Sequence, residues 1–519
     1  MARYYLTTAI DYANGDPHMG HAFEKIGADA IARYRRLRGD EALFVIGMDE
    51  HGQGVLQEAE RQKCPPQEWV DRVADRFRRT WDRLEVAPDD FIRTTEERHT
   101  RAVQALIERI IAAGDIYSDR YEGYYCARCE AFRKESELVE GRCPVHPSRE
   151  ITWTEEENFF FRLSKYRDPL LEHIRAHPEF VQPASRRNEI LRLLEGGLED
   201  ISASRSRVPW GVPFPGDPEH TVYVWFDALP NYISAIGYPD ERFRTWWPAS
   251  LHVIGKDITR FHCVIWPAML MSAGLPLPRT VWGHGFVMIG GGKLSKSEAQ
   301  LLDLEALVGR HGPDAFRYFL LREVPWDGDR DFPSAQAFLD QFDARYEADL
   351  ANDLGNLLSR TVSMLRKYRG GAVPGAGETA LDEAGAGALA DWERAMDGLL
   401  LHQGIEAAMG IARRANGFID AEQPWKLAKQ PESAERLDGV LRALVRALAR
   451  TAVALSPFMP GKCEEIWRRL GGEGSLPRLE ELEARLPSRL PVPASGVLFP
   501  RPDTDGPGPE AGPRGTALA

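Results

Sequence analysis

The sequence has few cysteines, no long apolar segment and no excess of basic charge, and each absence excludes a class of protein. Six cysteines in 519 residues are too few for a disulfide-rich scaffold. No stretch approaches the roughly 18–20 apolar residues that a membrane span needs, and the N-terminal residues lack the features of a signal peptide. The net charge of −13 excludes binding of nucleic acid by bulk positive charge. We therefore expect a cytoplasmic protein with no membrane partner.

The order of the expected elements predicts a divided α/β domain followed by a helical one. A β-rich run at residues 3–10, a helical pattern at 20–37 and a buried strand at 42–47 are typical of a Rossmann-like, doubly wound parallel sheet. Strand-like runs return at 222–226, 251–254 and 280–289, around a helical stretch at 260–272. The predicted boundaries are 1–116 and 222–334 for the two halves of the catalytic domain, 117–221 for an insertion, 335–485 for an α-helical bundle, and 486–519 for a partly disordered tail. We expect the first part of the insertion, residues 117–155, to be loop-rich.

Two histidines flank a glycine where the first strand leads into the first helix, in the segment His18-Met19-Gly20-His21. The exposed N–H groups at a helix start, beside imidazoles, suit a phosphate, and Gly20 would let a flat ligand such as a purine approach the backbone. Two histidines that cap the helix or lie on the surface are the alternative interpretation.

A glycine-rich loop follows the last expected strand. Gly290-Gly291-Gly292 precede Lys293-Leu294-Ser295-Lys296-Ser297 in a chain where only 11 of the 65 basic residues are lysine. Compact cations of this kind suit a polyphosphate, and the glycines would let the loop close over it. A solvated hairpin tip is the alternative.

Four potential metal ligands occur in two pairs, Cys126-Ala-Arg-Cys129 and Cys143-Pro-Val-His146. Two ligand pairs, each with a two-residue gap, are typical of tetrahedral zinc, one ion per chain. Because all four ligands are protein groups, the ion would be structural and would order a segment with little core of its own. A redox pair is the alternative, but it leaves the second pair unexplained.

The ordered pair of phosphate-binding segments resembles the HIGH and KMSKS signatures of class I aminoacyl-tRNA synthetases, with Met19 and Leu294 as apolar replacements. The resemblance implies that Mg²⁺ accompanies ATP and that His18, His21, Lys293 and Lys296 are catalytic. The implied ATP-binding residues are His18, Gly20, His21, Lys293, Ser295, Lys296 and Ser297.

Segments 9–12, 47–52, 224–232 and 255–262 resemble methionyl-tRNA synthetases in particular. In that family Asp49 would hold the α-ammonium of methionine, and Tyr12 or His262 would donate weakly to its sulfur. An aromatic-lined pocket suits a flexible, polarizable thioether, although residues such as Trp225 taken alone are more often core aromatics. The implied methionine pocket consists of Ile10, Tyr12, Asp49, Trp225, Ala228, Leu229, Tyr232, Ile258 and His262.

The helical region carries a further set of residues that the same family uses to recognise the anticodon of tRNA(Met). Asn356 and Arg360 lie one turn apart on one helix face, and Trp425 follows Pro424. Stacking combined with polar contacts to base edges is how single-stranded RNA is read. The sequence alone favours a core tryptophan packed between helices.

The resemblance implies a methionine--tRNA ligase that forms methionyl-adenylate from L-methionine and ATP and transfers the methionyl group to the 3′-terminal ribose of tRNA(Met). The alternatives are a synthetase for another class I amino acid and a nucleotidyltransferase outside the synthetases. Residues 117–221 leave no room for the large editing domain of the branched-chain enzymes. No appended barrel or coiled coil is evident after Arg485, which favours a monomer.

Overall fold

The computed structural model describes residues 2–126, 131–133, 135, 138–144, 151–206, 208–291, 301–375, 377–491 and 496–501. Its main sheet is parallel throughout, which confirms the predicted α/β class. The order is β2-β3-β1-β13-β14-β8, with β4 also paired to β3. The strands are β1 (Arg3–Thr8), β2 (Asp11–Tyr12), β3 (Glu41–Asp49), β4 (Asp90–Arg93), β8 (Val181–Gln182), β13 (Leu251–Gly255) and β14 (Val281–His284).

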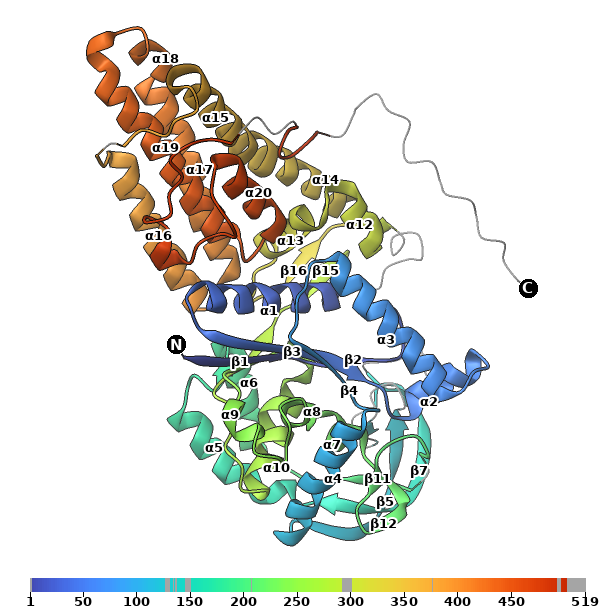
Figure 1. Cartoon of the computed structure of the whole chain (residues 1–519). Helices are drawn as coiled ribbons and strands as arrows, with labels where there is room; N and C mark the ends of the chain where they lie inside the picture. The colour runs from blue at the N-terminus through green and yellow to red at the C-terminus, as the bar shows by residue number, and fades with distance from the viewer. Residues whose placement is uncertain are drawn as a thin grey trace.

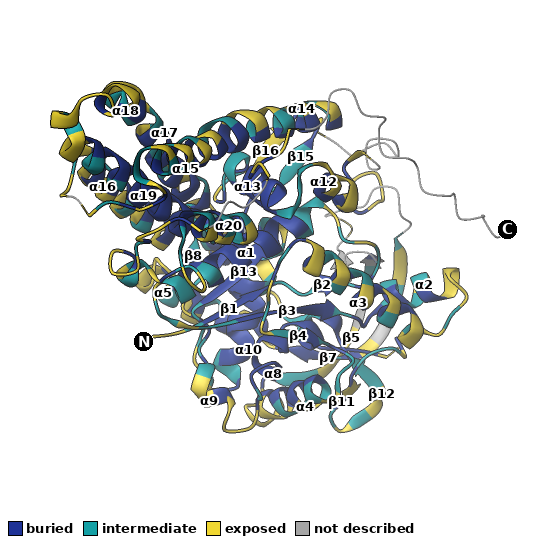
Figure 2. Ribbon diagram, turned by 45° about the horizontal axis from the view of Figure 1, so that its top comes forward, coloured by how far each residue is buried: buried dark blue, intermediate teal, exposed yellow. Residues whose placement is uncertain are grey.

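Helices cover both faces of this sheet (Figure 1). One face carries α1 (Met19–Leu37) and α3 (Pro66–Arg83), with α2 (Gln53–Arg61) beside them. The other face carries α4 (Glu97–Ala112), α8 (Asn231–Ser234) and α10 (Trp266–Ser272), while α9 (Phe243–Trp246) lies near β1. Each face has its own hydrophobic core, and Figure 2 shows α1, β1 and β13 largely buried.

The segment expected to be loop-rich between residues 117 and 155 is instead mostly strand where it is described. Strand β5 (Ile116–Cys126) pairs with β7 (Thr152–Phe161) over ten antiparallel positions, because aromatic residues recur along both. Strands β6 (Ala131–Arg133) and β9 (Ile201–Ser202) complete this sheet, and β10 (Ser204–Arg205), β11 (Pro213–Phe214) and β12 (Asp217–Val222) form another.

The middle of the expected insertion returns to the main sheet. After the short helix η2 (Leu163–Tyr166), α5 (Arg167–Ala176) and α6 (Ala184–Glu195) flank β8, which pairs with β14 as an edge strand. The domain boundaries given above remain predictions.

Two of the expected strands differ from the structure. The run at 222–226 was expected to be a strand, but β12 ends at Val222 and α7 (Val224–Ala228) follows. The run at 280–289 divides into β14 and β15 (Val287–Ile289), which pairs with β16 (Arg330–Phe332) outside the main sheet. The helical stretch at 260–272 is confirmed as η4 (Phe261–Ile265) and α10, after the short η3 (Lys256–Ile258).

The predicted α-helical bundle is confirmed and lies against the α1 face of the sheet (Figure 1). Its helices are α14 (Ala335–Arg345), η5 (Tyr346–Gly355), α15 (Asn356–Arg369), α16 (Ala380–Asp397), α17 (Leu401–Glu422), α18 (Pro424–Leu427), η6 (Pro431–Ser433), α19 (Ala434–Leu455), α20 (Pro460–Leu470) and η7 (Leu479–Glu481), preceded by α12 (Leu304–His311) and α13 (Pro313–Glu323). No helix in the described part of the chain has the length and apolar character to span a membrane. The tail beyond residue 501 lies outside the described residues.

A fully buried arginine joins the bundle to the sheet. Arg317 on α13 donates to Asp29 on α1 at 2.5 Å and to the carbonyl of Phe458, before α20, at 3.0 Å. A guanidinium with several fixed donors suits this junction of three chain segments. Arg317 therefore fixes the bundle to helix α1, which begins at the carboxyl end of the sheet.

Candidate active site

The paired histidines form the start of helix α1 at the carboxyl end of the sheet. His18 is the N-cap, and its Nδ1 accepts a hydrogen bond from Gly20 N at 3.1 Å. The Nδ1 of His21 accepts from His18 N at 3.2 Å, and the two rings stack with centroids 3.7 Å apart. The alternative that the histidines cap the helix is thus confirmed, and it does not compete with phosphate binding.

The capping bonds also fix the protonation of both rings. Burial lowers the pKa of His18, and burial, with Lys25 and the second imidazole nearby, lowers the pKa of His21 well below its usual value. Both rings are therefore neutral at pH 7, and because each Nδ1 accepts, each Nε2 carries the proton. Two Nε2–H donors at the positive end of a helix suit the α-phosphate side of a nucleotide.

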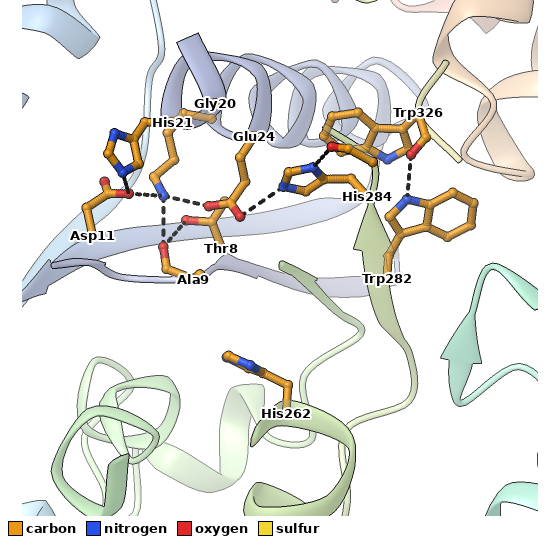
Figure 3. A network of polar contacts seen from close by, with 12 residues as sticks. Thr8, Ala9, Asp11, Gly20, His21, Glu24, His262, Trp282, His284 and Trp326 are labelled. Atoms are coloured by element: carbon orange, nitrogen blue, oxygen red, sulfur yellow. Dashed lines mark hydrogen bonds and ion pairs between the residues drawn. The ribbon is translucent and has the colours of Figure 1, made fainter. Parts of the chain in front are cut away.

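A buried polar network lies beneath these histidines (Figure 3). Asp11 Oδ1 is 4.0 Å from His21 Nε2 and 2.9 Å from Lys25 Nζ. Glu24 bonds to Lys25 at 2.7 Å and to His284, the last residue of β14, at 3.1 Å. Burial raises the pKa of Asp11 to about 7, although Lys25 lowers it. The network joins the ends of β2 and β14 through helix α1.

The indole of Trp326 packs against one end of this network, at His284. Trp326 stacks on His284 with ring centroids 5.3 Å apart, and its carbonyl accepts a hydrogen bond from the Trp282 indole at 3.3 Å. A Cβ on Gly27 of α1 would lie 2.1 Å from the Trp326 ring, so only glycine allows this contact.

Most of the expected methionine-pocket residues gather around the hydrophobic core on the α10 face, whereas Tyr12 packs against the core on the α1 face. Leu229 and Tyr232 belong to that core, and Ile10, Trp225 and Ile258 pack against it. Ala228 is buried on α7, and Tyr12 lies opposite Asp49 in the β2–β3 register. Trp225 also stacks on Phe261 at 3.6 Å between centroids. The structure therefore brings most of these residues together, while their role stays a prediction.

The two candidate donors to the sulfur have different surroundings. His262 Nδ1 lies 3.0 Å from the Ile258 carbonyl, which can only accept, so Nδ1 carries the proton. Its Nε2 then accepts from the Tyr232 hydroxyl at 2.6 Å. Burial lowers the pKa of His262 to about 4. Both ring nitrogens of His262 are therefore engaged, and the Tyr12 hydroxyl lies close to Gly54 on α2. Which of the two donates to the sulfur stays a prediction.

A buried carboxylate lies between two histidines, and no motif in the sequence indicates this group. Asp227 on α7 accepts from His51 Nδ1, just after β3, at 2.6 Å and from His99 Nε2, on α4, at 2.9 Å. Burial raises the pKa of Asp227, but the two histidines outweigh it and lower the pKa to about 2. Asp227 thereby fixes α7, which carries Trp225 and Ala228, to the strand that ends in Asp49.

Only part of the expected zinc site can be described. Cys126 ends β5 and Cys143 follows the bridge between Val139 and Arg142, and both side chains are buried. Buried thiols on two strand-like segments fit a zinc knuckle, while Cys129 and His146 lie outside the described residues. Within the described ranges no group of three candidate metal ligands occurs, so the zinc stays a prediction.

The glycine-rich loop is described only at its start. Gly290 and Gly291 have φ values of 62° and 63°, and Gly291 N donates to Asp331 of β16 at 3.2 Å. The expected ATP-binding residues Lys293, Ser295, Lys296 and Ser297 lie outside the described residues.

The expected anticodon residues lie on the bundle, and the tryptophan is not part of its core. Trp425 is 42% exposed, which contradicts a tryptophan packed between helices, whereas Pro424 is buried at the start of α18. Asn356 is exposed on α15, and Arg360 pairs with Asp420 near the end of α17 at 2.7 Å. A half-exposed indole near polar side chains can stack on an unpaired base.

The parallel sheet, the capped helix start and the glycine-rich loop define a class I aminoacyl-tRNA synthetase. The sequence matches the family described as tRNA synthetases class I (M) over residues 4–152 and 148–362. A methionine--tRNA ligase of Caldanaerobacter subterraneus subsp. tengcongensis is 43% identical, with 97% of this chain and 79% of the relative covered. One from Streptomyces coelicolor is 41% identical, with 96% of each covered.

The same similarity extends to solved structures. The Mycobacterium tuberculosis methionyl-tRNA synthetase in complex with methionyl-adenylate superposes with a TM-score of 0.91 and 42% identity, covering 96% of this chain and 100% of that one. The chain belongs to the methionine--tRNA ligase family.

Proposed function

We propose that this chain activates L-methionine with ATP and transfers the methionyl group from methionyl-adenylate to the 3′-terminal ribose of tRNA(Met). The observation that carries the proposal is the capped start of α1, whose two Nε2–H donors lie at the carboxyl end of the parallel sheet. Its relatives in the family are named for this ligase activity.

The first step needs positioning more than proton transfer. The methionine carboxylate is already a nucleophile and attacks the α-phosphorus of ATP in line, so catalysis consists mainly of orientation and stabilisation of charge on the phosphates. His18 and His21 serve the α-phosphate side, with Gly20 leaving room for the nucleotide. Lys293 and Lys296, helped by Ser295 and Ser297, hold the pyrophosphate, and Mg²⁺ bound with ATP neutralises part of its charge.

Methionine occupies the pocket between the β2–β3 end and helix α7. Asp49 binds the α-ammonium, and Tyr12 opposite it donates to the sulfur. Trp225, stacked on Phe261, provides an apolar wall. The indole N–H of Trp225 is buried without a hydrogen-bond partner among the described residues. The remaining wall consists of Ile10, Ala228, Leu229, Tyr232, Ile258 and His262.

The bundle reads the tRNA. Trp425, 42% exposed, stacks on an anticodon base, and Asn356 and Arg360 bind base edges, with Pro424 fixing the turn before the indole. Arg360 must then leave or share its bond to Asp420.

One structural zinc at Cys126, Cys129, Cys143 and His146 orders the insertion, and the protein works in the cytoplasm as a monomer.

Charging of purified tRNA with labelled methionine tests the proposal as a whole. We expect label on tRNA(Met) and strongly reduced label when the anticodon bases of the same transcript are replaced. Absence of charging by an enzyme that forms methionyl-adenylate would contradict the tRNA step. Release of an adenylylated small product in place of charging would favour the nucleotidyltransferase alternative.

A further inference from the structure

Helix α1 contains a lysine that is completely buried. Lys25 is 0% exposed and lies one turn after His21. Its Nζ is 2.8 Å from the Ala9 carbonyl, 2.9 Å from Asp11 Oδ1 and 2.7 Å from Glu24 Oε1. An ammonium group has three N–H donors, so each donor has one acceptor. Figure 3 shows Ala9, Asp11 and Glu24 converging at the end of the sheet.

The acceptors come from the two halves of the proposed site. Ala9 and Asp11 flank Ile10 of the methionine pocket. Glu24 bonds to His284 at 3.1 Å, and His284 ends the strand β14 that leads through β15 into the glycine-rich loop. The Lys25 ammonium group therefore binds both the segment that flanks the proposed methionine pocket and the glutamate that leads to the proposed nucleotide site.

The charges of this cluster depend on the ammonium. Burial raises the pKa of Glu24, but Lys25 and His284 outweigh it and lower that pKa. Burial lowers the pKa of Lys25, but Asp11 and Glu24 outweigh it and raise that pKa. Loss of the cation would leave two carboxylates and a carbonyl buried around an empty centre, which a folded protein relieves by moving or protonating them.

We propose that Lys25 is a positioning residue that couples methionine binding to nucleotide binding by holding the Ala9–Asp11 segment and the Glu24–His284 pair in one arrangement. The inference rests on the proposed function. Methionine that packs on Ile10 and Tyr12 orders the segment on which Lys25 is anchored, so the nucleotide meets an ordered Glu24–His284 pair. The coupling is reciprocal, as any coupling between two binding equilibria must be.

A binding cycle tests the proposal. The Kd of methionine is measured by calorimetry with and without a non-hydrolysable ATP analogue, in the wild type and in Lys25→Met. We expect each ligand to strengthen the other by roughly fivefold or more in the wild type, the usual lower range of coupling, and this factor to fall towards one in Lys25→Met. Lys462→Met, which removes a lysine paired with Glu465 at 3.1 Å on α20, is the matched control and should keep the wild-type factor.

A double variant separates positioning from simple charge neutralisation. Lys25→Met combined with Asp11→Asn removes one of the two carboxylates that lose the ammonium, but it does not restore the three hydrogen bonds of Lys25. We expect the coupling to remain lost in the double variant, and its return would overturn the proposal. Should Lys25→Met fail to fold, Lys25→Gln, which is one atom shorter, loses the charge and keeps two N–H donors, takes its place in the same cycle.

The pH profile of methionine-dependent pyrophosphate exchange gives a second readout. Because Lys25 lowers the pKa of Asp11, its loss should move the acid limb, expected near pH 7, to higher pH. A general structural defect would lower the rate without moving that limb, and this result would contradict the proposal. The charged and titratable groups that interact with Asp11 or with its partner Glu24 are His21, Lys25, Tyr232, Asp257, His262 and His284.

The outcomes distinguish this inference from the proposed function. A wild type that activates no methionine refutes the function itself. A wild type that activates methionine, with coupling absent or equal in Lys25→Met, refutes only the role of Lys25.

Discussion

Replacement of Asp227 by asparagine should lower the free energy of unfolding by an amount that follows from the pKa of Asp227. The pKa of this fully buried carboxyl is lowered from 3.8 to about 2 by His51 and His99. Since one pKa unit corresponds to about 1.4 kcal/mol, the charged form contributes about 2 kcal/mol at pH 7. Asparagine keeps the shape and places a donor where one of the two histidines also donates, so we expect Asp227→Asn to lose about that amount.

The pH dependence of this loss follows from the sign of the shift. A lowered pKa in the folded state gives stability that is complete above pH 3.8, the unfolded value, and disappears as pH falls through about 2. The difference between wild type and Asp227→Asn should therefore be constant near neutrality and fall to roughly half by pH 3.

Urea unfolding followed by tryptophan fluorescence at pH 7 and pH 3 measures both quantities. Asp240→Asn is the control, because its pair with Arg101 has both side chains 57% exposed and should contribute less than about 0.5 kcal/mol. A loss below about 0.5 kcal/mol for Asp227→Asn at pH 7, or a loss that does not change by pH 3, would refute the reasoning. Because α7 also carries Trp225, the KM for methionine should rise roughly tenfold, with a smaller change in the KM for ATP.

Three further predictions concern the other proposed sites. Trp425→Ala should raise the KM for tRNA roughly 5- to 100-fold, the value of one stacked base, while pyrophosphate exchange stays unchanged and Trp425→Phe keeps most of the charging; equal damage to both reactions would contradict an anticodon role. Lys296→Ala should slow pyrophosphate exchange by about two orders of magnitude or more with methionine binding unchanged, and a rate within about threefold of wild type would be inconsistent with its assignment. Metal analysis should find about one zinc per chain, and active enzyme without zinc would disprove the structural site.

The local features of the fold could be predicted because their signals lie close together in the sequence. The helix after His18 shows a helical period and begins at a capping residue, and β1, β3 and β13 are β-rich runs. The prediction of a strand at 222–226 is wrong: β-branched and aromatic residues favour strands, yet β12 already ends at Val222 and helix α7 begins at Val224.

The polar networks of the site could not be predicted, because their members lie far apart in the sequence. Asp227 is 176 positions from His51 and 128 from His99, and no spacing connects three such residues. A lysine on a helix is usually exposed to solvent, and only the packing of α1 on the sheet shows that Lys25 is buried. The exposure of Trp425 could not be predicted either, because it depends on the turn at Gln423, which sets the direction of the indole.

The most direct test of the proposed function is ATP–pyrophosphate exchange measured separately with each of the twenty amino acids. The account predicts strong exchange with methionine and little with the others, because the pocket around Trp225 and Tyr232 is apolar and Asp49 supplies the contact to the α-ammonium. Exchange driven best by another amino acid, or none with methionine, would contradict it.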